Sequence, residues 1–420
     1  MKPAYYSSPR WSTEIHDCSM PMTFDTYSMC SFNCLYCFAV NRKAVGNCAH
    51  KFSSRSAQLS VVNVDAIKRM FTDPDQHGGQ FTEYIKNRFA MQWGGLSDPF
   101  DNNERRLGVS LELLKFFRDI QYPICFSTKG TWWVNDKRYV DAFTGGKFNV
   151  KFSVITLDEN KAREIEIGVP TPAERLRAMH TASRFVEGGV TLRLRPFIIG
   201  VSNPLHVRLV EQAAACGATA VSTEFMCLEG RLPQCIIDTR FGRISHVIGH
   251  DVWAFYKQNS DVKSGYMRLS RKVKLPFIKD MQEACKRTGL RFYVSDQHFK
   301  ERCDNGSCCG LPESWKYSRG QWCEALQIAY HNGSVRWSAI APDLASYAKS
   351  FSFKDAAGYN QGRSETRARF ATFSMYDFLH WSWNNPKYSH SPSTMFAGIL
   401  APLPDLDGAG NVVYKWIAPK

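Results

Sequence analysis

Short apolar runs rich in β-branched residues alternate along this chain with amphipathic stretches, which is the pattern of repeated βα units. The apolar runs predict strands at Met22–Tyr27, Ala90–Trp93, Ile124–Thr128, Val150–Thr156, Thr191–Ile199 and Ala220–Phe225. The amphipathic stretches predict helices at Asp65–Phe71, Glu104–Asp119, Pro172–Val186 and Pro204–Cys216. Six such units predict an α/β fold built as an open, partial (β/α)6 barrel, in which the loops after the carboxyl ends of the strands carry the chemistry.

Two local signals support these helices. Apolar residues recur at steps of three and four along Glu104–Asp119, as one face of a helix requires: Leu107, Leu111, Leu114 and Phe117. At the start of Pro172–Val186, Thr171 and Glu174 have the spacing of a capping box.

The composition and the hydrophobic pattern of the chain change near residue 300. A CDNGSCCG segment is followed by a tail rich in aromatic residues, including Trp381, Trp383, Tyr388, Phe396, Tyr414 and Trp416. Its Gly and Pro content and its lack of long periodic segments predict a compact, loop-rich extension. We therefore expect a barrel over residues 1–300 and an extension over residues 301–420.

The chain is basic, with 53 Lys and Arg against 39 Asp and Glu and a formal charge of +14. Between Thr239 and Arg302 there are 14 basic and 6 acidic side chains, with aromatic residues such as Trp253 and Tyr266 among them. Basic side chains could screen phosphates and the rings could stack on bases, so DNA is the expected partner. A solvated helix face is the alternative interpretation of the same charges.

No segment reaches ~18 uninterrupted apolar residues, and the first 25 residues contain no apolar run. We therefore expect a soluble, cytoplasmic protein with no membrane partner. Fourteen cysteines in such a chain indicate metal or redox chemistry and reduced thiols more than a disulfide framework. Neither the oligomeric state nor the strandedness of bound DNA follows from the sequence.

Three of these cysteines are closely spaced in MCSFNCLYCFAV, where Cys30, Cys34 and Cys37 form a C-x3-C-x2-C pattern after the first predicted strand. A structural zinc site has four protein ligands in a closed tetrahedron. A [4Fe–4S] cluster held by three thiolates leaves one iron open to bind a small molecule through nitrogen and oxygen. The pattern therefore favours an iron–sulfur cluster, with zinc or unrelated cysteines as alternatives.

The same residues resemble the radical S-adenosylmethionine (SAM) superfamily, whose C-x3-C-x-aromatic-C signature they match with Tyr36 in the aromatic slot. This resemblance implies that the open iron binds SAM and that one electron then releases a 5′-deoxyadenosyl radical, which abstracts hydrogen from the substrate. It also implies a reductant such as flavodoxin or ferredoxin. The protein would position the substrate and exclude water while the cofactor supplies the difficult chemistry.

The resemblance also implies cofactor contacts elsewhere. Gly94 and Gly95 end the second predicted strand, where the family often has a glycine pair near the methionyl amino group, although Leu96 replaces the usual acidic residue. Ser153, and Arg193 or Arg195, stand where relatives contact the ribose or the carboxylate. An ordinary strand-end turn and polar residues satisfying nearby backbone are the alternatives.

Within this superfamily, four segments resemble the spore photoproduct lyase-like branch: YCFA, LSDPFDNNE, STKG and RLRPFIIG, all between Thr23 and Ser295. That branch acts on DNA. It returns hydrogen through a cysteine and a tyrosine, and this chain has Gly95 and Phe38 at those two positions. Tyr36 or Cys125 could substitute for them, and Asp98, at a strand end on the catalytic rim, could orient substrate or ribose, as Asp101 and Glu104 also could. First-turn helix capping is the alternative for Glu104.

The absence of this cysteine and this tyrosine favours a radical isomerase, because a product radical can take its hydrogen back from 5′-deoxyadenosine. Phage enzymes that rearrange an amino-acid adduct on the thymine methyl carbon suit this requirement, so we expect phage DNA hypermodification in a host cytoplasm, by analogy of fold. A spore photoproduct lyase-like repair lyase and a radical enzyme acting on tRNA or peptide stay open. So does a nucleic-acid-binding zinc protein without catalysis.

A second cysteine group, Cys303, Cys308, Cys309 and Cys323, follows the predicted barrel. The long interval before Cys323 resembles radical enzymes whose extension binds a second [4Fe–4S] cluster. A structural zinc ion or unbound thiols are the alternatives. The remaining cysteines, Cys18, Cys48, Cys125, Cys216, Cys227, Cys235 and Cys285, have no ligand spacing and are mostly expected to be small core residues.

Overall fold

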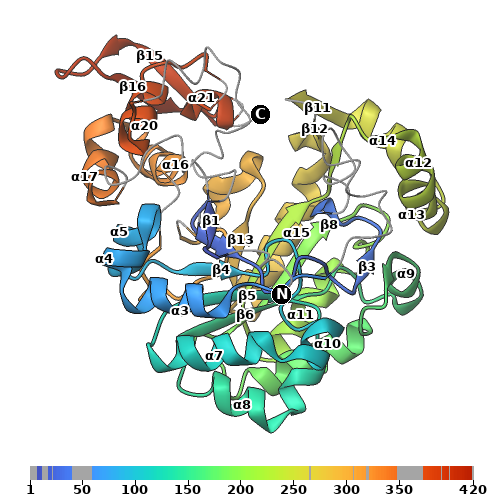
Figure 1. Cartoon of the computed structure of the whole chain (residues 1–420). Coiled ribbons are helices and arrows are strands. Elements are labelled where there is room, and N and C mark those ends of the chain that lie inside the picture. The colour runs from blue at the N-terminus through green and yellow to red at the C-terminus, as the bar shows by residue number, and fades with distance from the viewer. Residues whose placement is uncertain are drawn as a thin grey trace. The chain divides into compact units, whose positions relative to one another are not determined.

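The computed structural model describes residues 7–11, 18–20, 22–39, 59–263, 266–305, 307–317, 321–347, 372–388, 390–396 and 398–418 (Figure 1). Cys48 lies outside these residues. The chain forms two compact units. The first comprises Met1–Ser7, Asp25–Val64 and Trp93–Phe292, and the second comprises Ser8–Phe24, Asp65–Gln92 and Tyr293–Lys420.

The largest sheet has eight strands in the order β1-β2-β4-β5-β6-β8-β9-β13. The bounds are β1 Arg10–Trp11, β2 Met22–Phe24, β4 Met91–Trp93, β5 Ile124–Thr128, β6 Phe148–Ser153, β8 Val190–Phe197, β9 Ala218–Phe225 and β13 Arg291–Val294. The pairs β5–β6, β6–β8 and β8–β9 are parallel, whereas β1 and β2 are antiparallel. The six predicted strands are confirmed as β2, β4, β5, β6, β8 and β9, and they follow one another in chain order, as repeated βα units require.

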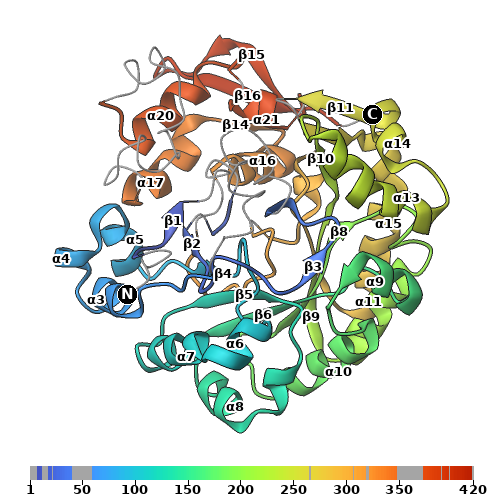
Figure 2. The same ribbon diagram turned by 45° about the vertical axis from the view of Figure 1, so that its right-hand side comes forward.

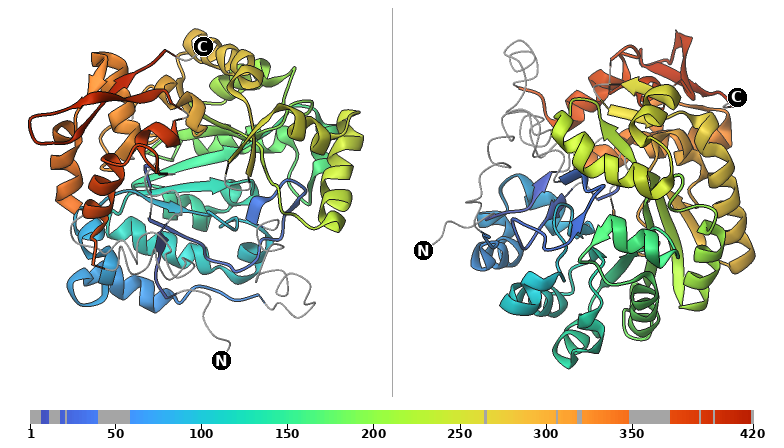
Figure 3. Two further views of the ribbon diagram at one scale, coloured as in Figure 1. Left: turned by 90° about the horizontal axis from the view of Figure 1, so that it is seen from above. Right: turned by 90° about the vertical axis from the view of Figure 1, so that its right-hand side faces the viewer.

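The helices of the first unit connect the strands from β4 onward, and Figure 3 draws them in cyan to yellow. Their bounds are α6 Asn102–Leu107, α7 Val109–Asp119, η3 Trp132–Asn135, α8 Lys137–Phe143, α9 Glu159–Ile165, α10 Pro172–Ala182 and α11 His206–Ala215. After β9 come α12 Gln234–Ile236, the π-helix η4 Ile237–Phe241, α13 Gly242–Ile248, α14 Val252–Asn259 and α15 Arg271–Thr288. The predicted capping box of Thr171 and Glu174 is confirmed at the start of α10.

The predicted single helix Glu104–Asp119 is wrong in one respect. Gly108 has a φ of 69°, and it separates α6 from α7. A left-handed residue ends a helix because its amide bonds back to the preceding turn, here to the Glu104 carbonyl at 2.8 Å. Leu107, predicted to lie on the apolar face, is consequently exposed.

Side chains of the parallel strands alternate strictly between two faces. Phe126, Phe148 and Phe152 point to one face, where their rings contact Trp133 and Phe143 of the η3–α8 segment at centroid distances of 5.3–5.9 Å. The opposite face carries polar side chains at successive cross-strand positions: Ser127, Lys151, Ser153, Thr191, Arg193, Ser222 and Glu224. All of these except Arg193 are buried. A buried polar sheet face is costly unless it is hydrogen-bonded or binds a ligand.

Two small sheets complete the first unit. Strands β3 Asn33–Cys34 and β7 Glu166–Ile167 pair antiparallel, with Cys34 opposite Glu166. Strands β10 Cys227–Glu229, β12 Tyr266–Leu269 and β11 Ser260–Lys263 form a three-stranded antiparallel sheet in that order. Strand β10 follows β9 after a single residue, Met226 (Figure 2).

The second unit combines helices with a separate three-stranded sheet, in the order β14-β16-β15. The bounds are α3 Val64–Thr72, α4 Pro74–His77, η2 Gly79–Phe81, α5 Thr82–Lys86, η5 Gln297–Arg302, α16 Gln321–Asn332, β14 Ser334–Val335, α17 Trp337–Tyr347, α20 Met375–Trp383, α21 Pro392–Met395, β15 Leu400–Leu406 and β16 Val412–Trp416. Tail aromatics build its core, because Trp383 contacts Trp322, Trp337 and Tyr414 at centroid distances of 4.8–5.8 Å. Of the helices in the described part of the chain, none has the length and apolar character needed to cross a membrane.

Candidate functional site

The first three cysteines lie on one loop of the first unit. Cys34 is in β3, and the amide of Cys37 donates to the Cys34 carbonyl at 3.1 Å. Burial raises the pKa of the Cys34 thiol to about 11 and also raises the pKa of Cys30. Buried thiols ionise readily only beside a positive charge, which bound iron would supply. Cys30, Cys34 and Cys37 are the side chains that would hold such a cluster.

Arg240 and Asp101 hold this loop from two sides. Arg240, in the π-helix η4, donates from Nε to the Leu35 carbonyl at 2.9 Å and from Nη2 to the Cys34 carbonyl. Asp101 accepts from the Ser31 amide at 2.5 Å, and it also caps α6 by accepting from the Asn103 amide at 2.9 Å. The sequence analysis missed Arg240, since nothing in its local pattern separates it from the surrounding basic residues.

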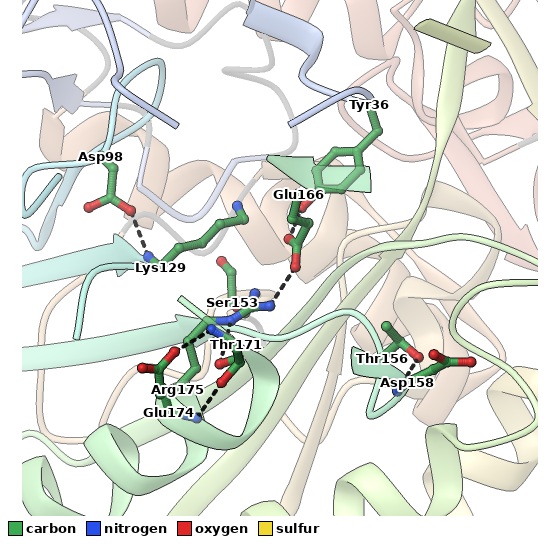
Figure 4. A network of polar contacts seen from close by, with 10 residues as sticks. All are labelled: Tyr36, Asp98, Lys129, Ser153, Thr156, Asp158, Glu166, Thr171, Glu174 and Arg175. Atoms are coloured by element: carbon green, nitrogen blue, oxygen red, sulfur yellow. Dashed lines mark hydrogen bonds and ion pairs between the residues drawn. The ribbon is translucent and has the colours of Figure 1, made fainter. Parts of the chain in front are cut away.

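Tyr36 belongs to a buried ionic network (Figure 4). Its hydroxyl donates to Glu166, and Arg175 donates to the other Glu166 oxygen at 2.5 Å and to the Ser153 carbonyl at 2.6 Å. Burial raises the pKa of Tyr36 above its ordinary value, and the neighbouring Cys34 and Glu166 charges act in the same direction. In this arrangement Tyr36 orients the cysteine loop, and a catalytic role for its hydroxyl stays a prediction.

Lys129 brings a cation to the same place. Its ammonium lies 5.7 Å from the centroid of the Tyr36 ring, and its charge lowers the pKa of Cys34 against the larger effect of burial. Lys129 follows β5 directly, so it occupies the carboxyl end of a parallel strand, where active sites of such folds lie. The sequence analysis quoted STKG as a resemblance but assigned no role to this lysine.

The glycine pair follows β4. Gly94 has a φ of 88°, and a Cβ there would lie 2.8 Å from the Pro99 side chain and 2.9 Å from the Ser127 carbonyl, so only glycine fits. Gly95 is half-buried beside it. The next two amides, of Leu96 and Ser97, donate to Asp25 Oδ1 at 2.7 and 2.9 Å.

Asp98 joins this loop to the end of β5. It accepts from the Lys129 amide at 2.6 Å, the Thr128 hydroxyl at 2.7 Å and the Phe100 amide at 2.9 Å. Burial raises the pKa of Asp98 to about 6, although these hydrogen bonds oppose the shift. Cys125 shares the polar sheet face but lies near the start of β5, fully buried, with its thiol donating to Asn149 Oδ1 at 3.1 Å. Substrate contacts for both residues stay predictions.

The structure separates the two arginines that the sequence analysis left as alternatives. Arg193 Nη1 donates to Ser153 Oγ at 3.4 Å, across the β6–β8 pairing. Arg195 instead forms an ion pair with Glu224 of β9. Ser153 and Arg193 are thus a pair on the polar face, and Arg195 belongs to a different charged group.

All four cysteines of the second group are buried in the second unit. Cys308 Sγ and Cys309 Sγ are 3.9 Å apart, Ser19 Oγ lies 3.8 Å from Cys308 Sγ, and the Cys303 thiol contacts the Val294 backbone. Within the described residues, no three His, Cys, Asp or Glu side chains converge on a single metal-ion position. A zinc site needs such convergence, whereas the thiolates of a cubane cluster bind separate irons.

No protein-family model and no curated protein matches this chain. Similar solved structures include a spore photoproduct lyase variant with bound AdoMet and dinucleoside spore photoproduct, at a TM-score of 0.49 and 14% identity over 66% of this chain and 78% of that chain. The chain is similar to spore photoproduct lyase. A second structure of spore photoproduct lyase, complexed with dinucleoside spore photoproduct, matches at a TM-score of 0.49 and 15% identity over 66% of this chain and 76% of that chain.

A third solved structure, of TYW1 with a lysine-pyruvate adduct bound, matches at a TM-score of 0.32 and 13% identity over 55% of this chain and 74% of that chain. The resemblance to spore photoproduct lyase predicted from the sequence motifs is thus found among solved structures as well. A likeness of this extent leaves the substrate and the reaction to be argued from the residues of this chain.

One expectation about the basic block needs correction. Lys274, counted among the residues that could face phosphates, is buried, and its ammonium lies 5.9 Å from the centroid of the Phe225 ring. The exposed cations of α15 are Lys272, Lys279, Lys286 and Arg287. Helical periodicity decides this division, because a helix that packs one face buries whichever residues lie on it.

Proposed function

We propose that this chain is a radical SAM enzyme that rearranges an amino-acid substituent on thymine in DNA. The observation that carries the radical SAM part is the cysteine loop, which brings Cys30, Cys34 and Cys37 together and whose backbone carbonyls accept from Arg240. When bound there, a [4Fe–4S] cluster with SAM supplies a 5′-deoxyadenosyl radical after reduction by a protein such as flavodoxin or ferredoxin.

The residues of the chain would then bind and orient the reactants. Gly94 lets backbone approach the cofactor closely, and Ser153 with Arg193 offers a hydroxyl and a cation for its ribose or carboxylate. Lys129 adds positive charge beside the loop. The polar sheet face is consistent with a polar reactant in a site shielded from water, where such charges act strongly.

Two positions support an isomerase over a repair lyase. Gly95 carries no side chain that could donate hydrogen, and Phe38, with 57% of its surface exposed, carries no hydroxyl. A reaction that returns hydrogen from 5′-deoxyadenosine to the product radical needs neither group. A similar spore photoproduct lyase structure contains a dinucleoside spore photoproduct, which together with the charge of +14 supports DNA as the substrate class.

The test is anaerobic reconstitution followed by incubation with SAM, reductant and DNA bearing glycine on the thymine methyl carbon. We expect bound iron and a rearranged nucleoside of unchanged mass, with more product formed than SAM consumed, because the product radical takes its hydrogen back from 5′-deoxyadenosine. Cys34→Ala should lose both iron and product, whereas Cys216→Ala, a half-buried cysteine after α11, should lose neither. Zinc in place of iron would contradict the radical SAM part of the proposal. Unchanged nucleosides with an intact cluster would contradict the rearrangement of thymine.

We also propose that the second cysteine group holds a second [4Fe–4S] cluster. The four cysteines are buried in one unit, and Cys308 Sγ and Cys309 Sγ lie 3.9 Å apart, which supports this assignment. A Cys309→Ala/Cys323→Ala double variant should lose about four irons per chain while SAM cleavage at the first loop persists. Unchanged iron content in that variant would remove the second cluster.

A further inference from the structure

A charged group on the polar sheet face has no role in cofactor binding as described above. Arg195 is the third residue from the end of β8, Glu224 is the second from the end of β9, and the two form an ion pair. Arg268 of β12 adds a second guanidinium, with Nη1 3.9 Å from Glu224 Oε1. One carboxylate between two arginines leaves a net charge of +1.

Local backbone geometry brings these three side chains together. The β8–β9 register shifts between Leu194 and Phe197, so Arg195 lies in an irregularity of the kind that re-aims a side chain beside a binding site. Strand β10 continues from β9 and pairs with β12, placing Arg268 opposite Cys227, three residues after Glu224. Four chain segments are therefore needed to build this group.

The exposure of the three side chains is graded. Glu224 is 10% exposed, whereas Arg195 and Arg268 are 29% and 28% exposed. A carboxylate this enclosed keeps its lone pairs aimed at a few neighbours, while the two arginine side chains present part of their surface to a ligand. The group can therefore accept one anionic oxygen pair at the arginines and one ammonium at the glutamate.

We propose that Arg195, Glu224 and Arg268 bind the zwitterionic amino-acid part of the substrate, its carboxylate on Arg268 and Arg195 and its ammonium on Glu224. This rests on the proposed function, because it names the part of the adducted thymine that the site recognises. A phosphate would gain from the arginines alone and would be repelled by Glu224. The buried carboxylate is therefore the feature that favours a zwitterion over a DNA phosphate.

The test is equilibrium binding, by fluorescence anisotropy, of a labelled oligonucleotide with one glycyl-thymine, against the same oligonucleotide as its methyl ester. The reconstituted wild-type protein should bind the free acid about tenfold or more tightly than the ester, since a charge-assisted pair is lost in the ester. Arg268→Gln should abolish that ratio, and Arg268→Lys should restore part of it. Glu224→Gln removes the partner of the ammonium, so it should weaken the binding of acid and ester alike. The control Arg287→Gln removes a 3.1 Å ion pair between Arg287 of α15 and Glu211 of α11, and it should leave the acid-over-ester ratio unchanged.

Three outcomes would overturn the inference: equal wild-type affinity for acid and ester, a ratio that survives Arg268→Gln, or unchanged affinity for both ligands in Glu224→Gln. Equal binding of unmodified DNA and the glycyl oligonucleotide would assign the arginines to phosphate and would overturn it too. Failure of the proposed function looks different. In that case the acid-over-ester ratio persists and depends on Arg268, while the nucleoside stays chemically unchanged.

Discussion

Arg240 is the side chain on which the cysteine loop depends most, so its replacement is the sharpest test of how the site is held. Its guanidinium reaches the carbonyls of Leu35 and Cys34, both buried residues. In an Arg240→Met variant the Leu35 carbonyl loses this donor. The Cys34 carbonyl also loses it but still accepts a hydrogen bond from the Cys37 amide. The loop then keeps the contact between the Ser31 amide and Asp101 but loses both guanidinium contacts.

The size of the effect follows from these two bonds. A hydrogen bond from a charged donor contributes about 1.5–3 kcal/mol, so two contribute roughly 3–6 kcal/mol. Burying the guanidinium offsets part of this, since burial lowers the pKa of Arg240. We expect Arg240→Met to weaken the ordered form of the loop by about 3 kcal/mol, a factor of about 100.

The assay is the rate at which reconstituted protein loses iron from the first loop to a chelator, measured without oxygen. Arg240→Met should lose it about 100-fold faster than wild type, and Arg240→Lys, which can reach one carbonyl, should fall between them. Arg243→Met is the matched control, because Arg243 lies one turn away, is 51% exposed and reaches Glu164 only at 3.6 Å. Equal rates for Arg240→Met and wild type would refute the reasoning.

Three further predictions concern the same unit. Arg175→Met leaves the Glu166 carboxylate buried without its cation, and we expect it to reduce the free energy of unfolding by about 3–5 kcal/mol. The melting temperature should then fall by about 10 °C, whereas the control Arg138→Met, which removes an exposed ion pair with Asp136, should leave it unchanged. Gly94→Ala should lower SAM affinity in equilibrium dialysis, whereas Gly398→Ala, at a φ of 86° but with open space around it, should not; equal effects would mean that crowding at Gly94 is unimportant. Burial lowers the pKa of His206 in the folded protein, so as pH falls the imidazole is protonated in the unfolded chain before it is protonated in the folded one. Stability should therefore fall as pH drops below about 6.5. His206→Phe, packed between Phe197 and Phe277, should flatten that pH dependence of the melting temperature, and an unchanged slope would exclude His206 as its source.

The sequence predicted correctly those elements whose structure depends on residues close together in the chain. The six predicted strands occur within a few residues, because β-branched runs and flanking turn residues act over short distances. The capping box at Thr171 is likewise a matter of two side chains three residues apart. The error at Gly108 arose from apolar spacing that continued across a residue whose φ of 69° ends the helix.

Contacts between distant segments could not be derived in this way. Arg240 is 205 residues from Leu35, and Glu166 is 130 residues from Tyr36, so no periodicity or spacing links them. The sequence likewise left Arg193 and Arg195 as equivalent candidates, since both lie on one strand with the same alternation. Only strand pairing put Ser153 beside the first and Glu224 beside the second.

The sequence by itself determined the βα order, the three-cysteine loop and hence the chemistry that loop can support, because these depend on residue type and on spacing within a few residues. The tertiary structure decided which charges face the loop, which face of the sheet is polar and where the arginines meet a carboxylate. The physical reason is that ion pairs and buried hydrogen bonds depend on distances through space, which only the packed chain sets.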